Sequence, residues 1–385
     1  MSFRTLGFLS LSATLALVAC QSQPDPVREA AEWTLTPAPD LVIGEDGTRE
    51  GEFDRIAAVL ALPGEEIAVV DGGHREIRVF STTGSHQRTL GRQGEGPGEF
   101  NGIAWVELDY DTLVVFDLGQ RRATLLGLDG TVHATIVLRP EGGTGFVFSR
   151  TRAANGSWVV TTSFGAARLV DQNAPPPSGV YRDTVGVGLL PAAGAGPVHY
   201  FLRTPSHSVV GVAGQNMVMR ARFSADLQMM RVGLRVAVAD PESATLRWYS
   251  ADGREESVVN LAIPRRPLLA AEVDRLRGEA LGGVTSPRGR LAVEASYSSE
   301  AVPAHLPVFA SVLSDGEDQL WLEEWRYETA APARYLVVGS EGDWRASVPM
   351  PPGFKPATIG PDWVLGIHRD ADGVQRVMRY GLTRR

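Results

Sequence analysis

A repeat dominates this sequence. Residues 66–84 (EIAVVDGGHREIRVFSTTG) align without a gap with residues 235–253 (RVAVADPESATLRWYSADG), so that Asp240 follows Asp71 by 169 residues. A third copy is centred on Asp117, 46 residues after Asp71. An interval of about 45 residues is typical of a four-stranded sheet that is used as a repeating unit. The chain is therefore predicted to fold as an array of such sheets.

Each copy has the residue pattern of antiparallel strands. A run rich in β-branched residues ends at an aspartate, a short polar turn follows, an alternating stretch resumes, and Asp-Gly or Thr-Gly closes a hairpin. One such sheet cannot bury both of its faces alone, so the sheets must stack around an axis, where ring closure leaves few exposed edges. The expected fold is all-β, a six-bladed β-propeller. Its units lie near residues 51–95, 98–140, 146–190, 205–260, 305–348 and 350–383.

Two segments of the predicted propeller domain, residues 33–385, depart from the repeat. Residues 33–43 are strand-like and precede the first unit, so we expect them to close the ring as the outer strand of the last blade. Residues 267–282 are predicted to form a short helical insertion between blades 4 and 5, either a packed decoration or a lid or docking element. The helix is indicated by apolar residues at helical spacing: Leu269, Val273, Leu276 and Ala280.

The first residues have the pattern of a bacterial export signal. Arg4 supplies positive charge, and a short apolar run leads to the sequence LVAC, a lipobox that ends at Cys20. The run is shorter than the roughly 20 apolar residues that a membrane-spanning helix needs. We therefore expect residues 1–19 to be a lipoprotein signal peptide, removed before Cys20, whose thiol carries a diacylglyceryl group.

Residues 20–32 are polar and contain two prolines, which is typical of a flexible tether. The expected protein is exported and lipid-anchored in the bacterial cell envelope, facing the periplasm or in the outer membrane. Cys20 is the only cysteine of the chain, so the sequence predicts no disulfide and no thiolate metal site.

Two sequence runs carry a family resemblance. Residues 94–100 (GEGPGEF) and 75–80 (REIRVF) resemble the NHL repeat, in which a glycine-rich turn and Gly-Glu-Phe precede a strand ending in Asp. With the lipobox and the helical insertion, the chain resembles the bacterial six-bladed β-propeller lipoproteins. The usual Asn-His of the repeat is reduced to Gly73-His74 in the first unit and is absent from the second.

The resemblance implies a fold and a compartment and leaves two functions open. NHL-like propellers are mostly platforms for proteins, peptides or glycans, whereas some related six-bladed propellers are metal-dependent lactonases or lyases. The formal net charge of −8 argues against nucleic acid as a partner, because phosphates require a basic surface. Nearly all positive charge is arginine, to which the sequence alone assigns no function.

Catalytic and metal-ligating residues are not indicated. The seven histidines are scattered without a His-x-x-x-His pair, and no Gly-x-Ser-x-Gly motif occurs. A calcium ion in the central channel, held by oxygen ligands, is the one cofactor left open. The favoured function is a non-enzymatic binding or scaffolding lipoprotein for an unknown protein, peptide or glycan. The alternative is a metal-dependent lactonase or lyase, which needs at least three acidic, Asn or His side chains meeting at the channel.

Two sets of repeated residues have competing interpretations. The aspartates Asp71, Asp117 and Asp240 could form a ligand-binding crown, but their recurrence in register favours carboxylates that accept backbone N–H bonds in the turn. Several tryptophans could stack on a ligand, although blade packing explains most of them. These are Trp105, Trp158, Trp321, Trp325 and Trp344.

Overall fold

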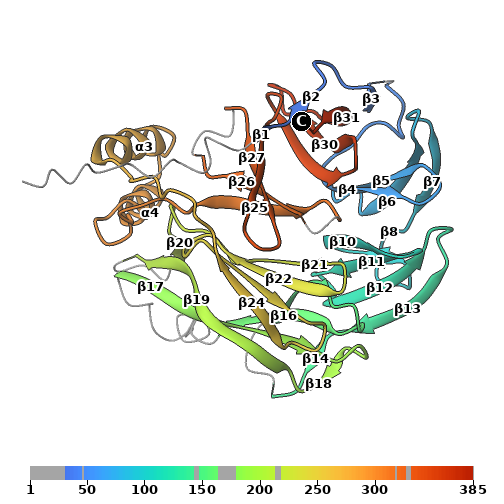
Figure 1. The fold of residues 1–385 in the computed structure, drawn as a ribbon, viewed down its shortest axis with the longest axis horizontal. Coiled ribbons are helices and arrows are strands. Elements are labelled where there is room, and N and C mark those ends of the chain that lie inside the picture. Colours follow the sequence, from blue (N-terminus) through green and yellow to red (C-terminus); the bar gives the residue numbers. More distant parts are fainter. Residues whose placement is uncertain are drawn as a thin grey trace, which may run out of the picture.

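The chain forms six sheets arranged around a common centre, antiparallel except for one short parallel edge strand (Figure 1). The structure is a computed structural model that describes residues 31–45, 47–142, 147–163, 179–212, 218–316, 319–326 and 331–384. The predicted six-bladed β-propeller, with a helical insertion between blades 4 and 5, is confirmed. Cys20 and the predicted signal peptide lie outside the described residues.

The first three blades differ in length. Blade 1 consists of β4 (Ile56–Leu62), β5 (Glu66–Asp71), β6 (Glu76–Ser81) and β7 (His86–Leu90). Blade 2 consists of β10 (Ile103–Asp109), β11 (Thr112–Asp117), β12 (Arg122–Gly127) and β13 (Val132–Val137). Blade 3 consists of β15 (Val147–Arg152), β16 (Trp158–Ser163), β17 (Gly179–Leu190), β19 (His199–Gly211) and β20 (Val218–Arg220).

The other three blades follow the same order from the centre outward. Blade 4 consists of β21 (Gln228–Val232), β22 (Arg235–Asp240), β23 (Thr245–Tyr249) and β24 (Glu255–Asn260). Blade 5 consists of β25 (Phe309–Ser314), β26 (Gln319–Glu324), β27 (Arg334–Gly339) and β28 (Trp344–Pro349), joined by β1 (Ala31–Glu32). Blade 6 consists of β29 (Phe354–Ile359), β30 (Trp363–Arg369) and β31 (Gln375–Thr383), joined by β2 (Thr34–Leu35) and β3 (Leu41–Ile43).

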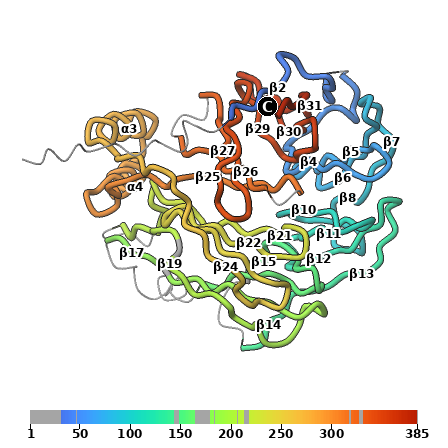
Figure 2. The backbone as a smooth tube through the Cα atoms, in the orientation of Figure 1, coloured from blue at the N-terminus to red at the C-terminus, as the bar shows by residue number. Residues whose placement is uncertain are grey.

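Two short parallel pairs connect successive blades. They are β8 (Arg92–Gln93) with β9 (Glu99–Phe100), and β14 (Arg139–Pro140) with β18 (Ala195–Gly196). The ring closes where the two ends of the described chain meet, since β2 and β3 both pair with β31 (Figure 2). Trp33, between β1 and β2, lies against Trp321 with ring centroids 6.0 Å apart. Closure therefore combines backbone pairing with aromatic packing.

The hydrophobic core is divided into layers between neighbouring blades. Blades 1 and 2, for example, bury Val70, Val79 and Leu113 against one another, each with no exposed surface. Blades 4 and 5 do the same with Trp248, whose indole N–H donates to the carbonyl of Ser340 at 2.9 Å. Burial on both sheet faces explains why the second strand of each blade is a continuous run of apolar residues.

The two open faces of the ring differ in what they carry. On one of these faces the innermost strand of each blade begins and the second strand ends. In blade 1, for example, Ile56 at the start of β4 pairs with Asp71 at the end of β5. We call this face the insertion face. The helical insertion connects β24 to β25 on this face. It contains α3 (Ala270–Gly282) and α4 (Pro287–Ser296), and α4 contacts β19 and β20 (Figure 1). Neither helix has the length and hydropathy of a membrane span, nor does any other helix in the part of the chain that is described.

Two boundaries differ from the prediction. The insertion, predicted at 267–282 with one helix, contains a second, α4, whose cap is Ser286 and which buries only Ala292 and Ser296. Too few apolar residues repeat there to reveal a helix. Blade 3 extends through Gly211 in β19 and on to Arg220 in β20, so the predicted start of the fourth unit at residue 205 was wrong. The long β17–β19 hairpin continues beyond the other strands of its blade, and repeat spacing carries no signal for such an extension.

Candidate functional site

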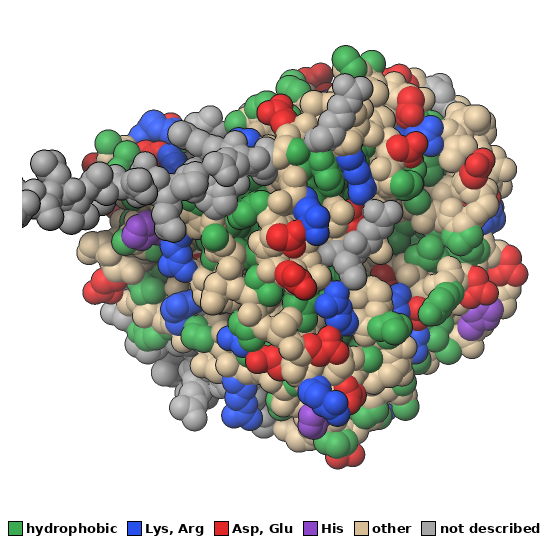
Figure 3. Space-filling model, viewed as in Figure 1, with side chains coloured by type: hydrophobic (Ala, Val, Ile, Leu, Met, Phe, Trp, Pro, Cys, Tyr) green, Lys and Arg blue, Asp and Glu red, His purple; other side chains and the backbone are tan. Residues whose placement is uncertain are grey.

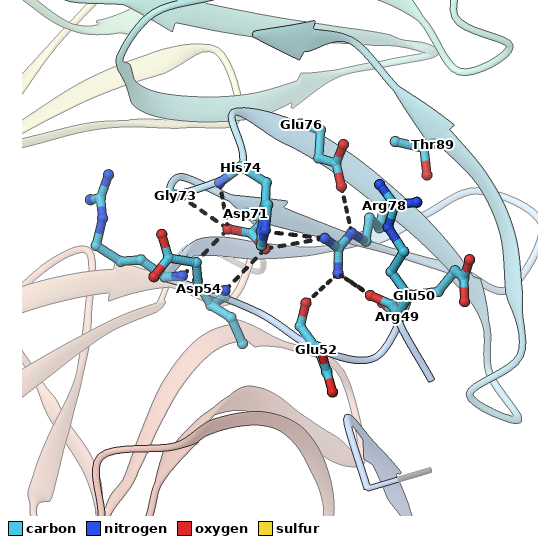
Figure 4. Close-up of polar contacts among 12 residues, drawn as sticks. Arg49, Glu50, Glu52, Asp54, Asp71, Gly73, His74, Glu76, Arg78 and Thr89 are labelled. Atoms are coloured by element: carbon cyan, nitrogen blue, oxygen red, sulfur yellow. Dashed lines mark hydrogen bonds and ion pairs between the residues drawn. The ribbon is translucent and has the colours of Figure 1, made fainter. Parts of the chain in front are cut away.

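The repeated aspartates hold the turns of the insertion face. The carboxylate of Asp71 is fully buried and accepts backbone N–H bonds from Gly73 and His74 at 3.1 Å, and from Asp54 and Arg55 at 3.3 and 3.4 Å (Figure 4). The His74 ring lies 2.8 Å away. Burial opposes ionisation of Asp71, but these hydrogen bonds outweigh it and lower its pKa. The predicted structural role is confirmed here.

The same arrangement of a carboxylate and turn N–H groups recurs in blades 2 and 4, with fewer contacts. Asp117 accepts the N–H of Asn101 at 2.6 Å and of Gln120 at 3.0 Å. Asp240 accepts the N–H of Glu242 at 2.9 Å and the Ser243 hydroxyl at 2.7 Å. Their oxygens are engaged by the protein itself, which favours the structural role over a ligand-binding crown.

Arginines complete the first two turns. Arg78 donates to the carbonyls of Arg49, Glu50 and Glu52, the last at 2.6 Å (Figure 4). In blade 2, Arg122 donates to three carbonyls of the preceding glycine-rich loop, those of residues 95, 96 and 99. Each arginine therefore fixes the loop that leads into its blade. The residues of the NHL-like motif thus have a structural role in these two turns.

An ion-pair network lies where three inner strands end, on the face opposite the insertion. Asp109 of β10 pairs with Arg231 of β21 at 2.8 Å and with Arg152 of β15 at 3.4 Å. Glu107 accepts the Thr151 hydroxyl at 2.6 Å and the N–H of Arg152 at 3.0 Å. Burial raises the pKa of Glu107, despite these bonds and the nearby Arg231 charge. The network joins three blades across the centre of the ring.

Replacing Glu107 with Gln tests the cost of this buried charge. A raised folded-state pKa means that Glu107 contributes stability below its ordinary pKa and loses it as pH rises through the folded value. We therefore expect Glu107→Gln to raise Tm by about 2 °C at pH 8, the shift that roughly 1 kcal/mol causes in a large domain, and to leave it unchanged at about pH 4, below the ordinary pKa of a glutamate. Thermal melts at both pH values measure this. A lower Tm at pH 8 would show that the carboxylate stabilises the ring, and Asp109→Asn, which loses two ion pairs, serves as the destabilised control.

A metal site does not emerge in the described part of the chain. Among these residues no three His, Cys, Asp or Glu side chains come together as a group that could hold a metal ion. The two acids on the inner strands, Glu107 and Asp109, are instead engaged by arginines and a threonine. His74 and His207 each pair with a single aspartate, Asp71 and Asp226.

Three cavities that open on the insertion face lie on blades 3 to 5. The largest of these three, about 450 Å³, lies between blades 3 and 4 and includes Arg182, Asp240, Arg247 and Arg265. The smallest, about 170 Å³, lies under the start of the insertion, beside Arg266 and Glu324. The third, about 400 Å³, is called here the arginine cavity. Its lining is Met219, Arg220, Ala221, Arg222, Phe223, Ser224, Ser296, Trp325 and Arg326.

The predicted tryptophans divide between core and cavity. Trp158 and Trp321 are fully buried, and Trp105 stacks on Phe116 with centroids 5.6 Å apart. Trp344 packs against the core between blades 4 and 5. Trp325 differs because it lines both the arginine cavity and the smallest cavity. Sequence reasoning missed the arginines beside it, since they come from segments about 100 residues apart.

Comparison with known proteins agrees with the fold. Residues 48–136, which cover blades 1 and 2, match the family DUF5128, described as a 6-bladed beta-propeller. A 90-residue stretch is 30% identical to RING finger protein nhl-1 of Caenorhabditis elegans; it covers 23% of this chain and 9% of that protein. The chain thus spans about a tenth of the length of this relative. The NHL-like character of the sequence agrees with this match.

Several solved structures resemble the whole chain. A putative exported protein from Bacteroides fragilis aligns with a TM-score of 0.49 at 10% identity, over 95% of this chain and 97% of that one. A duf4221 family member from Bacteroides vulgatus gives 0.48 at 8% identity, over 93% and 100%. A gluconolactonase from Xanthomonas campestris gives 0.45 at 13% identity, over 86% and 87%.

Proposed function

We propose that this chain is a lipid-anchored binding module of the bacterial cell envelope, which presents the insertion face of its propeller to a protein, peptide or glycan. One observation carries the proposal. The additions to the plain blade pattern, namely the extended β17–β19 hairpin, β20 and the two helices, gather on the face that holds the three cavities. Additions to a repeat array commonly collect on its binding face.

The size and lining of the cavities agree with ligand binding. The two larger ones, of about 450 and 400 Å³, lie within the range of small-molecule sites, and their linings combine apolar side chains with several charged and polar ones. The alternative, a metal-dependent lactonase or lyase, requires three converging ligands. Among the described residues no three His, Cys, Asp or Glu side chains form such a group, so we favour binding without catalysis.

Photo-crosslinking in cells tests the proposal. A photoreactive amino acid replaces one exposed residue at a time, at Ser243 or Arg288 on the insertion face and at Glu65 or Arg254 on the opposite face. We expect a discrete adduct at the first two positions and none at the other two, read as a mass shift of the purified protein. Adducts of equal yield on both faces, or on the opposite face alone, would overturn the assignment of the binding face.

A further inference from the structure

The cavities of the insertion face are positively charged although the chain is acidic. Counting described residues only, seven arginines and three acidic residues line the three cavities, whereas the chain as a whole has 45 acidic and 37 basic residues. On the face shown in Figure 3, acidic and basic side chains are interspersed. The arginine excess is thus a local property of the cavities, and charge focused in a concave site attracts a ligand of the opposite sign.

The arginine cavity concentrates this charge. Among the described residues, its lining contains Arg220, Arg222 and Arg326 and no acidic residue. Two of these arginines also bind acids beside the cavity, Arg220 with Asp226 at 2.6 Å and Arg326 with Glu323 at 3.2 Å. These pairs orient the guanidinium groups, and both arginines also donate to carbonyls, Arg220 to that of Ser224 at 2.9 Å and Arg326 to that of Ala331.

Arg222 is the cation with the greatest freedom to bind a ligand. It is exposed and lies over the Tyr297 ring at 5.8 Å, and no ion pair with an acid is found for it among the described residues. A polar group without a partner lies nearby. The indole Nε1 of Trp325 is buried and has no hydrogen-bond partner in the described part of the chain, although its ring lines the cavity. A buried donor of this kind is costly unless a ligand or water accepts its proton.

We propose that the arginine cavity binds an anionic group, a carboxylate or a phosphate ester, of the ligand. The inference rests on the proposed function and names the chemistry of its ligand. Arginine is suited to this task because its planar fork matches both groups with two parallel hydrogen bonds. The partly exposed Trp325 ring, which lines the cavity, supplies apolar contact for the part of the ligand next to the acid.

Calorimetric titration of the purified protein tests this inference. The probes are inorganic phosphate, a galacturonic acid trisaccharide, and the methyl ester of that trisaccharide as a neutral match. We expect phosphate or the acid sugar to bind, and the ester to bind at least about tenfold more weakly, since a charge-assisted hydrogen bond contributes more than a neutral one. Binding of phosphate alone would identify a phosphate ester, and binding of the acid sugar alone a carboxylate.

Matched variants locate the site. Arg222→Gln is expected to weaken binding about tenfold, Trp325→Phe to weaken it less, and Arg222→Lys to retain part of it. Arg254→Gln is the control, because Arg254 lies on the opposite face with a side chain that is 81% exposed. No binding of either anion at millimolar concentration, or equal binding by the wild type and Arg222→Gln, overturns the inference. If crosslinks were nevertheless confined to the insertion face, the proposed binding function would still be supported, and only the anionic character of the ligand would be refuted.

Discussion

Asp71→Ala is expected to destabilise the protein by about 3 to 5 kcal/mol, the cost of removing one partner from a buried, hydrogen-bonded charge pair. The fully buried carboxylate accepts four backbone N–H bonds, and Arg78, whose side chain is only 5% exposed, lies 3.5 Å from it. Alanine leaves all of these donors without their acceptor. The free energy of unfolding, from urea titration at pH 7, measures the effect.

An exposed aspartate and a conservative variant of Asp71 serve as comparisons. Asp252, in a hairpin turn of the opposite face, is 65% exposed, so Asp252→Ala should cost less than about 1 kcal/mol. Asp71→Asn keeps one acceptor oxygen and should recover part of the loss. Because the pKa of Asp71 is lowered by folding, its contribution is present above its ordinary pKa and disappears as the pH falls through the folded value. If Asp71→Ala and Asp252→Ala lowered the free energy of unfolding by the same amount, the turn would not depend on the Asp71 carboxylate.

Cys20→Ser is expected to release the protein completely from the membrane fraction. If Cys20 carries a diacylglyceryl group, its two acyl chains provide stable anchoring, and serine cannot form the thioether that holds them. Membrane fractionation, followed by intact-mass measurement of the mature protein, detects both the anchor and its loss. Ser22→Ala, two residues away, should leave both unchanged. A wild-type protein without the lipid mass, or a Cys20→Ser variant that stays in the membrane, would refute the anchor.

The sequence by itself determined the repeating architecture. Strand and turn preferences act over a few residues, and the contacts that express them are equally local: Asp71 binds the N–H groups of Gly73 and His74. The same spacing recurs at Asp117 with Gln120 and at Asp240 with Glu242. Short sequence patterns that recur at a fixed interval, together with the need to bury both faces of each sheet, were enough to predict the blades and the ring.

Only the tertiary structure decided which side chains meet. Asp109 and Arg231 pair across 122 residues because ring closure brings the ends of β10 and β21 together. The arginine cavity likewise combines residues near β20, in α4 and after β26, and α4 itself was missed. No sequence period encodes such contacts, since they depend on how the insertion and the extended β17–β19 hairpin pack on the finished propeller. Short-range sequence patterns therefore determine the scaffold, whereas the candidate binding site arises from contacts between distant segments that form only when the chain folds.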